Sequence, residues 1–414
     1  MDNKNINRQS VIIGAILIQL CLGAIYAWPV FTPSLKQAGW SNFQTQLVFS
    51  TGLASFAFVM VFAGRKLLTW GPRRLAIIAG ITLGSGYVLA GLMGGTNFWL
   101  ILFFIGLVGG AGIGFGYVVP ISVGMSWFPD KKGMITGIAV AGFGFGAMGW
   151  VKLAGTWGNL LSKYNLSGCF IIYGILFATL TIIGSIWMKY PPLKWKPKGY
   201  IENSNETKKT KGAISFTPPE MLSTISFYLV FFIFTFSAGA GLMTIGIMKL
   251  YPMQALEASG FTSVEASAIA GTAMALFFSL ANGTGRVLWG TMSDKLGRRN
   301  SVFLMTLSQG IIVLLFTKMA GTPVLLFMGA TIIGFNFGGN FALFPAFTAD
   351  LFGDKNVGIN YPYVYLSYGV GGILGPVLGG MLGDIGNFSM AFSICSILCF
   401  VGAGLALAIP IPQK

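Results

Sequence analysis

The stretch NFWLILFFIGLVGGAGIGFGYVVPISVGM, residues 97–125, contains no charged residue. A helix of about 20 apolar residues spans the ~30 Å hydrocarbon core of a bilayer. Lipid offers the backbone no hydrogen bonds, so only helices and closed barrels span it, and this stretch lacks the alternation of barrel strands. The stretch therefore predicts a transmembrane helix.

Similar runs recur along the whole chain of 414 residues, of which 54% are hydrophobic and only 9% are charged. Soluble domains carry about a quarter charged residues, so this composition excludes an ordinary soluble protein. We predict an all-α membrane protein with twelve transmembrane helices. The predicted spans are 10–32, 44–68, 74–94, 97–125, 133–157, 168–190, 224–250, 264–292, 300–319, 323–351, 357–383 and 388–409.

One long polar stretch, residues 191–223, divides these spans into six and six. It is rich in lysine, asparagine and proline, as solvated linkers are. We therefore predict two pseudo-symmetric six-helix bundles, an N-terminal one at 1–190 and a C-terminal one at 224–414, joined by a cytoplasmic linker at 191–223.

The basic residues predict the orientation of the chain. Of the 26 Lys and Arg, 20 fall on the side of the linker and four on the other, while Lys152 and Arg286 lie within predicted spans. Cytoplasmic loops carry the excess of basic residues, so both termini are expected inside. The same rule accounts for the net charge of +15, and we expect no nucleic-acid partner. The four basic residues on the outer side are Lys36, Lys163, Lys249 and Lys318.

The two halves resemble each other at an offset of about 225 residues. GPRR at 71–74 corresponds to GRR at 297–299, and FPDK at 128–131 corresponds to FGDK at 352–355. A six-plus-six repeat in a bilayer is typical of carriers in which two bundles rock about a substrate site near the midplane.

The residue inventory offers nothing for catalysis or metal binding. The chain has no histidine, no paired acids within a span, and four cysteines at irregular spacing in apolar segments. We expect no enzyme activity, no cofactor and no metal.

The string GTMSDKLGRR at 290–299 closely resembles the motif between the second and third helices of each half in the major facilitator superfamily. In this motif an acid at a helix end meets cations across a tight glycine turn. The ion pairs between them could act as a latch that forms and breaks as one half rocks. The expected latch residues are Asp294, Arg298, Arg299, Arg73 and Arg74. The first copy, at 64–74, has Leu68 where the acid would stand. Ordinary loop charges are the alternative reading.

Three further strings look like the oxalate/formate antiporter family and its bacterial monocarboxylate transporters, which are related to the animal ones. They are GAIYAW at 23–28, WFPDKKG at 127–133, and NFGG at 336–339 with FP at 344–345. This resemblance implies the facilitator fold, alternating access and small carboxylate substrates such as oxalate, formate, lactate or pyruvate.

Arg286 is the strongest candidate for binding a substrate. A charge at bilayer depth costs at least ~2.5–3.5 kcal/mol and persists when it faces a cavity and meets a partner. Asn282 precedes it by one helical turn, and a guanidinium binds a carboxylate bidentately. A structural arginine at the inner end of the helix is the alternative.

Lys152 is the second cation within a predicted span. It is either a second substrate cation or a coupling residue, or its side chain extends outward to the lipid headgroups.

Polar and aromatic residues in other spans are candidate lining of the cavity, although such aromatics also serve as lipid belt or packing. They are Tyr26, Trp28, Tyr117, Asn336, Tyr365 and Tyr368. In the antiporters that this chain resembles, a second cation for a dianion is expected at the position of Tyr368. Its replacement by tyrosine favours a monocarboxylate.

We therefore expect a transporter of a lactate- or pyruvate-like anion, working as a monomer in the bacterial cytoplasmic (inner) membrane. Proton symport is expected, with an obligate exchanger of the oxalate/formate type as the alternative. No acid lies deep in a span, so the proton would travel on the carboxylate itself or on Lys152.

Overall fold

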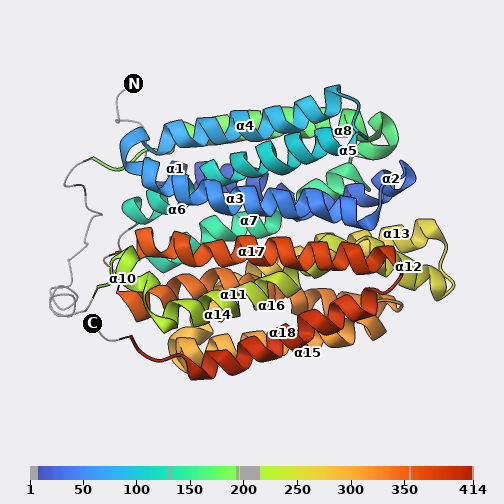
Figure 1. Cartoon of the computed structure of the whole chain (residues 1–414). Coiled ribbons are helices and arrows are strands. Elements are labelled where there is room, and N and C mark those ends of the chain that lie inside the picture. Colours follow the sequence, from blue (N-terminus) through green and yellow to red (C-terminus); the bar gives the residue numbers. More distant parts are fainter. Residues whose placement is uncertain (1–7, 129–131, 193–194, 196–214, 354–355, 413–414) are drawn as a thin grey trace.

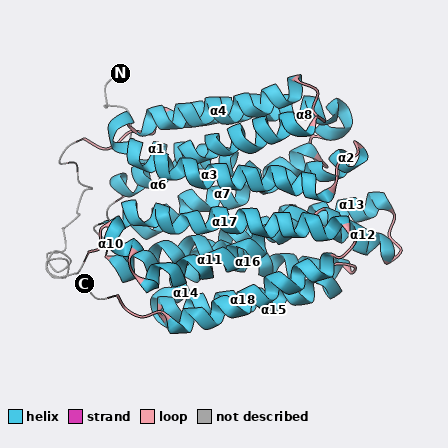
Figure 2. Cartoon of the chain, viewed as in Figure 1, coloured by secondary structure: helices cyan, strands magenta, loops and turns pink. Residues whose placement is uncertain are grey.

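The computed structural model describes residues 8–128, 132–192, 195, 215–353 and 356–412. Every regular element in these ranges is a helix (Figure 2). The all-α prediction is therefore confirmed for the described chain. Most of the predicted linker, and residues 129–131 of the WFPDKKG string, lie outside the described residues.

The first half of the chain forms helices that Figure 1 shows packed together in the upper part of the molecule. They are α1 (Arg8–Leu22), η2 (Gly23–Phe31), α2 (Thr32–Gln37), α3 (Asn42–Trp70), α4 (Pro72–Leu92), α5 (Phe98–Ile101), η3 (Leu102–Gly109), α6 (Gly110–Trp127), α7 (Lys132–Ala154) and α8 (Leu160–Ser185). We call this set the first half.

The remaining helices lie together in the lower part of Figure 1. They are α10 (Pro218–Leu222), α11 (Ile225–Ile247), α12 (Leu250–Ala258), α13 (Ser263–Thr272), η4 (Ala273–Phe278), α14 (Ser279–Leu296), α15 (Arg298–Met319), α16 (Pro323–Phe352), α17 (Val357–Asp384) and α18 (Phe388–Ala408). We call this set the second half.

Eleven helices of the described chain are long and apolar enough to cross a membrane. The predicted fifth span corresponds to α7, whose apolar described part is Val140–Ala154. The first span extends beyond its predicted end because the short helix α2 continues it, and the eighth span combines α13, η4 and α14. The first runs from Arg8 to Gln37, and the eighth runs from Ser263 to Leu296.

The repeated glycine turn has the same backbone in both halves. Gly71, between α3 and α4, has φ 79° and ψ 154°, and Gly297, between α14 and α15, has φ 81° and ψ 149°. Residues with a Cβ rarely adopt this region, so glycine is required where two long helices reverse without a loop. The sequence repeat thus corresponds to a repeated local structure.

Several spans of the described chain, α8 with its kink at Asn165 among them, depart from ideal α-helical geometry. The first span contains the 3₁₀ segment η2 with Pro29 inside it, and π-helical segments occur at η3 and η4. A π-helical turn shifts the register of a helix, and such turns are frequent at functional sites. The segment η4 immediately precedes α14, the helix that carries Arg286.

The two halves meet mainly along two helix pairs, α3 with α17 and α7 with α14, and α7 also packs against η4. Figure 1 places α10 at one end of the bundle and α2, α12 and α13 at the opposite end. The hydroxyl of Ser226, at the start of α11, donates to the carbonyl of Pro410, which follows α18. The beginning of α11 and the end of α18 therefore lie together at the α10 end.

Candidate functional site

The middle of α14 packs closely against a helix of each half, because glycines remove the side chains between neighbouring helices. A Cβ placed on Gly285 would stand 2.1 Å from the carbonyl oxygen of Phe335 in α16. On the other side, a Cβ on Gly144 of α7 would stand 3.2 Å from the backbone nitrogen of Gly283. These backbone contacts fix the position of the next turn of α14, which carries Arg286.

Arg286 is buried there, with 3% of its surface exposed. Its Nε donates to Oδ1 of Asn282 at 3.2 Å, one turn earlier on the same helix, as the sequence predicts. Its Nη1 donates to the backbone carbonyl of Val140, in α7 of the other half, at 3.0 Å. Arg286 therefore connects the two halves at their centre.

No carboxylate pairs with this guanidinium in the part of the chain that the structure describes. Its Nη2 and the Nδ2 of Asn282 are buried and have no hydrogen-bond partner among the described residues. Buried polar groups are nearly always hydrogen-bonded, and a buried charge without a partner is costly. The two free donors are thus suited to receive an anion from outside the protein.

Aromatic rings surround the guanidinium. The ring of Phe341 lies 4.1 Å from its Cζ, in cation–π geometry, and the ring of Phe143 lies 5.9 Å away. The hydroxyls of Tyr26 and Tyr117 are close enough for the charge of Arg286 to act on them. An apolar shell of this kind excludes water and strengthens a charge interaction formed within it.

The four predicted tyrosines form one cluster that continues across the halves. The hydroxyls of Tyr26 and Tyr368 are hydrogen-bonded at 2.9 Å. The ring of Tyr365 lies 4.9 Å from that of Tyr368 and 5.8 Å from that of Tyr117. The buried hydroxyl of Tyr365 has no hydrogen-bond partner among the described residues, which makes it a third group available to a ligand.

Other predicted residues lie elsewhere. The indole of Trp28 donates to the carbonyl of Thr45 at 2.9 Å, which ties η2 to α3 within the first half. Lys152 follows Val140 by twelve residues on α7, about 18 Å along a helix. Asn336 is buried on α16, and no described contact joins it to Arg286.

Three contributors to the site have no signal in the sequence. The carbonyl of Val140 is a backbone atom, so any residue could supply it, and only the close approach of α7 to α14 brings it to Arg286. Phe341 and Phe143 are two among 36 phenylalanines, and nothing in their local sequence separates them from packing residues.

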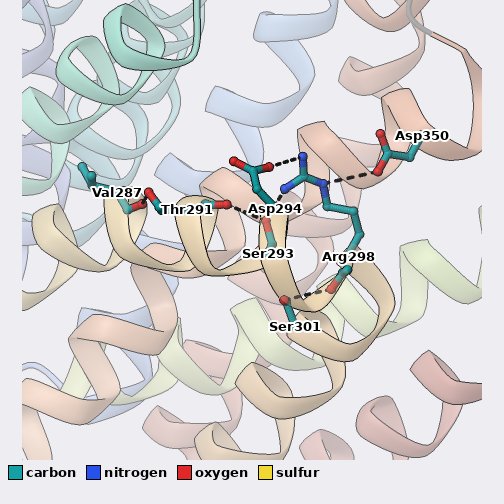
Figure 3. Close-up of polar contacts among 9 residues, drawn as sticks. Val287, Thr291, Ser293, Asp294, Arg298, Ser301 and Asp350 are labelled. Carbon is teal, nitrogen blue, oxygen red and sulfur yellow. Dashed lines mark hydrogen bonds and ion pairs between the residues drawn. The ribbon is translucent and has the colours of Figure 1, made fainter.

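The predicted latch residues of the second half lie around the turn between α14 and α15, where Figure 3 shows Asp294 beside Arg298. Arg298 contacts Asp294 at 2.7 Å and Asp350 of α16 at 3.3 Å, and it also donates to Ser293. The Nε of Arg299 donates to the carbonyl of Ala406 in α18 at 3.1 Å. All these partners belong to the second half, so in this structure the ion pairs hold one half together.

The first copy of the latch motif is arranged differently. The Nε of Arg73 is buried with no hydrogen-bond partner among the described residues, and Arg74 is exposed. The side chain of Leu68 lies outside what the structure describes.

Other contacts do cross between the halves, at both ends of the α3–α17 pair. At the end that carries α2 and α12, the carboxylate of Asp384 in α17 accepts from the backbone nitrogens of Asn42 and Phe43 at 2.5 and 2.9 Å. At the opposite end, Arg65 of α3 donates to the hydroxyl of Tyr363 in α17. Sequence reasoning identified neither contact.

Comparison with known proteins gives a family match. The family model described as Major Facilitator Superfamily matches residues 11–277 and, a second time, residues 230–414. An uncharacterized MFS-type transporter of Escherichia coli, YhjX, is 28% identical over 90% of this chain and 87% of its own.

Two further relatives have names that mention a substrate. The oxalate:formate antiporter of Oxalobacter formigenes is 24% identical over 96% of this chain and 90% of its own. The apicoplast pyruvate carrier 1 of Toxoplasma gondii is 23% identical over 86% of this chain and 80% of its own. The predicted relationship to major facilitator transporters is thereby confirmed.

Proposed function

The chain belongs to the major facilitator superfamily, and from that premise we propose that it is a secondary transporter which carries a small monocarboxylate by alternating access. It is an integral membrane protein with relatives among transporters of small anions. The one observation that carries the choice of substrate is the buried guanidinium of Arg286, which lacks a protein carboxylate among the described residues.

We infer an architecture of twelve spans, in which α7 supplies the twelfth, and two six-helix bundles at 1–190 and 224–414 joined by the linker at 191–223. The distribution of basic residues supports cytoplasmic termini in a bacterial inner membrane. The end of the bundle with α2, α12 and α13 is then the outer end, and the end with α10 is the inner end.

A carboxylate fits the unused hydrogen-bonding groups. One oxygen can accept from Nη2 of Arg286, and the other can accept from Nδ2 of Asn282 or from the hydroxyl of Tyr365. The surrounding rings of Phe143 and Phe341 suit a substrate with a short apolar end. A lactate- or pyruvate-like anion has both features.

The site favours one negative charge over two. Tyr368, where a second cation would stand in a carrier of a dianion, is buried and hydrogen-bonded to Tyr26. A second carboxylate would be placed among aromatic rings with no opposite charge, which costs several kcal/mol.

Contacts between the halves support a rocking movement about this site. Asp384 with the start of α3 closes the outer end, Arg65 with Tyr363 joins the inner end, and Arg286 with Val140 lies between them. A substrate carboxylate bound to Nη2 of Arg286 would share the guanidinium with the carbonyl of Val140, which accepts from Nη1. Binding would thus act directly on the junction that must rearrange during transport.

Proton symport is the coupling that we propose, with the proton carried on the substrate carboxylate or on a lysine. Obligate exchange of two anions is the alternative, because the antiporter of Oxalobacter formigenes is similar over nearly the whole chain. Proteoliposomes that contain no internal anion separate the two mechanisms. A symporter accumulates L-lactate with an inward proton gradient alone and makes the outside alkaline, whereas an exchanger requires internal anion and leaves the pH unchanged.

A screen of purified protein tests the substrate class. L-lactate, pyruvate, formate and oxalate are added separately, and the midpoint of thermal unfolding is measured. We expect stabilisation by monocarboxylates that exceeds stabilisation by oxalate, and loss of that stabilisation in Arg286→Ala. Equal stabilisation of the Arg286→Ala protein would contradict the proposed site.

A further inference from the structure

A second cationic position lies at the outer end of the interface between the halves. Lys249, between α11 and α12, is buried with 6% of its surface exposed. Its ammonium donates to the hydroxyl of Ser267 in α13 at 2.8 Å and to the backbone carbonyl of the same residue. An ammonium has three protons, so one remains after these two bonds.

A glycine leaves room beside this ammonium. A Cβ on Gly271, one turn beyond Ser267 on α13, would stand 3.4 Å from Nζ of Lys249. Burial, and to a smaller extent the charge of Lys152, lowers the pKa of the Lys249 ammonium to about 8. At neutral pH the group is therefore still mostly protonated.

Lys152 approaches the same place from the other half. It lies in the last turn of α7, and α7 packs against η4, the direct continuation of α13. Lys152 is close enough for its charge to act on Lys249. Extension of Lys152 to lipid headgroups would explain one lysine near a helix end, but it would not explain the burial of Lys249, which belongs to the other half.

Neither lysine has an ion-pair partner in the described ranges. The carboxylate of Glu265, on the same helix as Ser267, accepts instead from the backbone nitrogen and hydroxyl of Thr262. Two like charges near each other at a partly dehydrated interface repel. An anion placed between them would reduce this repulsion and give each ammonium an opposite charge.

We propose that Lys152 and Lys249 form an outer anion site, distinct from Arg286, which captures the substrate carboxylate before its transfer to the centre and holds it again on release. This inference rests on the proposed function and orientation. The site lies about 18 Å along α7 from the carbonyl that Arg286 contacts, so the two sites can be removed separately.

Transport in proteoliposomes tests the site with Lys249→Gln, Lys152→Gln and the double variant. An outer site on the path assists both capture and release, so Vmax/KM for L-lactate should fall about tenfold in uptake and in efflux alike. The wild-type rate should also decline as ionic strength rises, and the double variant should lose most of this dependence because the steering charges are absent. Lys318→Gln, an exposed outer lysine on α15, is the matched control and should behave as wild type.

Equilibrium binding of radiolabelled L-lactate separates this site from the central one. The Arg286→Ala protein should retain a weak component that disappears in Arg286→Ala/Lys249→Gln. Substrate-induced thermal stabilisation of Lys249→Gln alone should match that of wild type, because Arg286 is intact. An unchanged Vmax/KM, or a Lys249→Gln protein whose only defect is a lower unfolding midpoint without substrate, would overturn the outer site. Either result would leave the role of Arg286 intact.

Discussion

Two arginines twelve residues apart, Arg286 in α14 and Arg298 at the start of α15, show what a buried charge and a paired charge do in the same molecule. Arg298 is partly exposed and contacts two carboxylates, those of Asp294 and Asp350. Arg286 is almost fully buried, donates to an amide and a carbonyl, and pairs with no described carboxylate.

The difference separates a structural charge from a charge available to a ligand. The protein itself neutralises Arg298, so its removal disturbs a local network at the membrane surface, where exposed pairs contribute little. Arg286 has neutral acceptors only, and an anion from solution can add an interaction that the protein does not supply. Substitutions at these and related positions should therefore change transport by amounts that follow a predictable order.

The largest effect is expected from Arg286→Gln, compared with Arg298→Gln. Loss of a buried charge that contacts the substrate costs about 3–5 kcal/mol, so uptake of L-lactate at low concentration should fall by at least about a hundredfold. Arg298→Gln should retain uptake within about threefold of wild type. Initial rates in proteoliposomes with matched protein content measure both, and similar losses in the two variants would erase the distinction between the arginines.

The next effect concerns Asp384, a charge that acts between the halves. Its carboxylate accepts from two backbone nitrogens at the start of α3, where a negative charge is favoured by the helix dipole. Asp384→Asn should shift the equilibrium about threefold to tenfold toward the outward-open state. Labelling of a cysteine introduced at the outer end with a membrane-impermeant reagent measures this shift. Asp350→Asn, whose pairing stays within one half, is the control, and equal labelling of both variants would contradict a role in closure.

A smaller effect is expected from the tyrosine pair between the halves. Tyr26→Phe and Tyr368→Phe each remove the same 2.9 Å hydrogen bond, worth about 1 kcal/mol. Each should raise KM for L-lactate about threefold to fivefold, and the double variant should be no worse than either single one. Additive losses would show that the two hydroxyls act independently.

The smallest effect is expected from Asp294→Asn. Arg298 keeps Asp350 as a partner when Asp294 is neutralised, so the network loses one exposed ion pair. Uptake should change by less than about twofold, and substrate affinity should not change. A loss comparable with that of Arg286→Gln would mean that the motif acts between the halves in a state other than the one described here.

The sequence predicts well what depends on local patterns. Helical spans follow from apolar length, the reversals at Gly71 and Gly297 follow from a repeated motif, and the contact between Asn282 and Arg286 follows from helical periodicity. These features depend only on residues that are close together in the sequence.

Tyrosines from both halves were predicted to line one site, and they do gather there, but other contacts between helices from different halves were not predictable. The carbonyl of Val140 reaches Arg286 because glycines on α7 and α14 permit a close crossing. In the same way, Lys249 reads in sequence as one of four outer basic residues, and only packing brings it beside Lys152 and buries it. A single sequence carries no direct signal for such distances between elements.

The central claim is that Arg286 binds a carboxylate, and ligand-induced thermal stabilisation of the purified protein tests it most directly. Wild type, Arg286→Ala and Arg298→Ala are each titrated with L-lactate and pyruvate, and the unfolding midpoint is followed. We expect equal stabilisation of wild type and Arg298→Ala, with at least a tenfold weaker apparent affinity for Arg286→Ala. An Arg286→Ala protein stabilised at the same concentrations as wild type would contradict it.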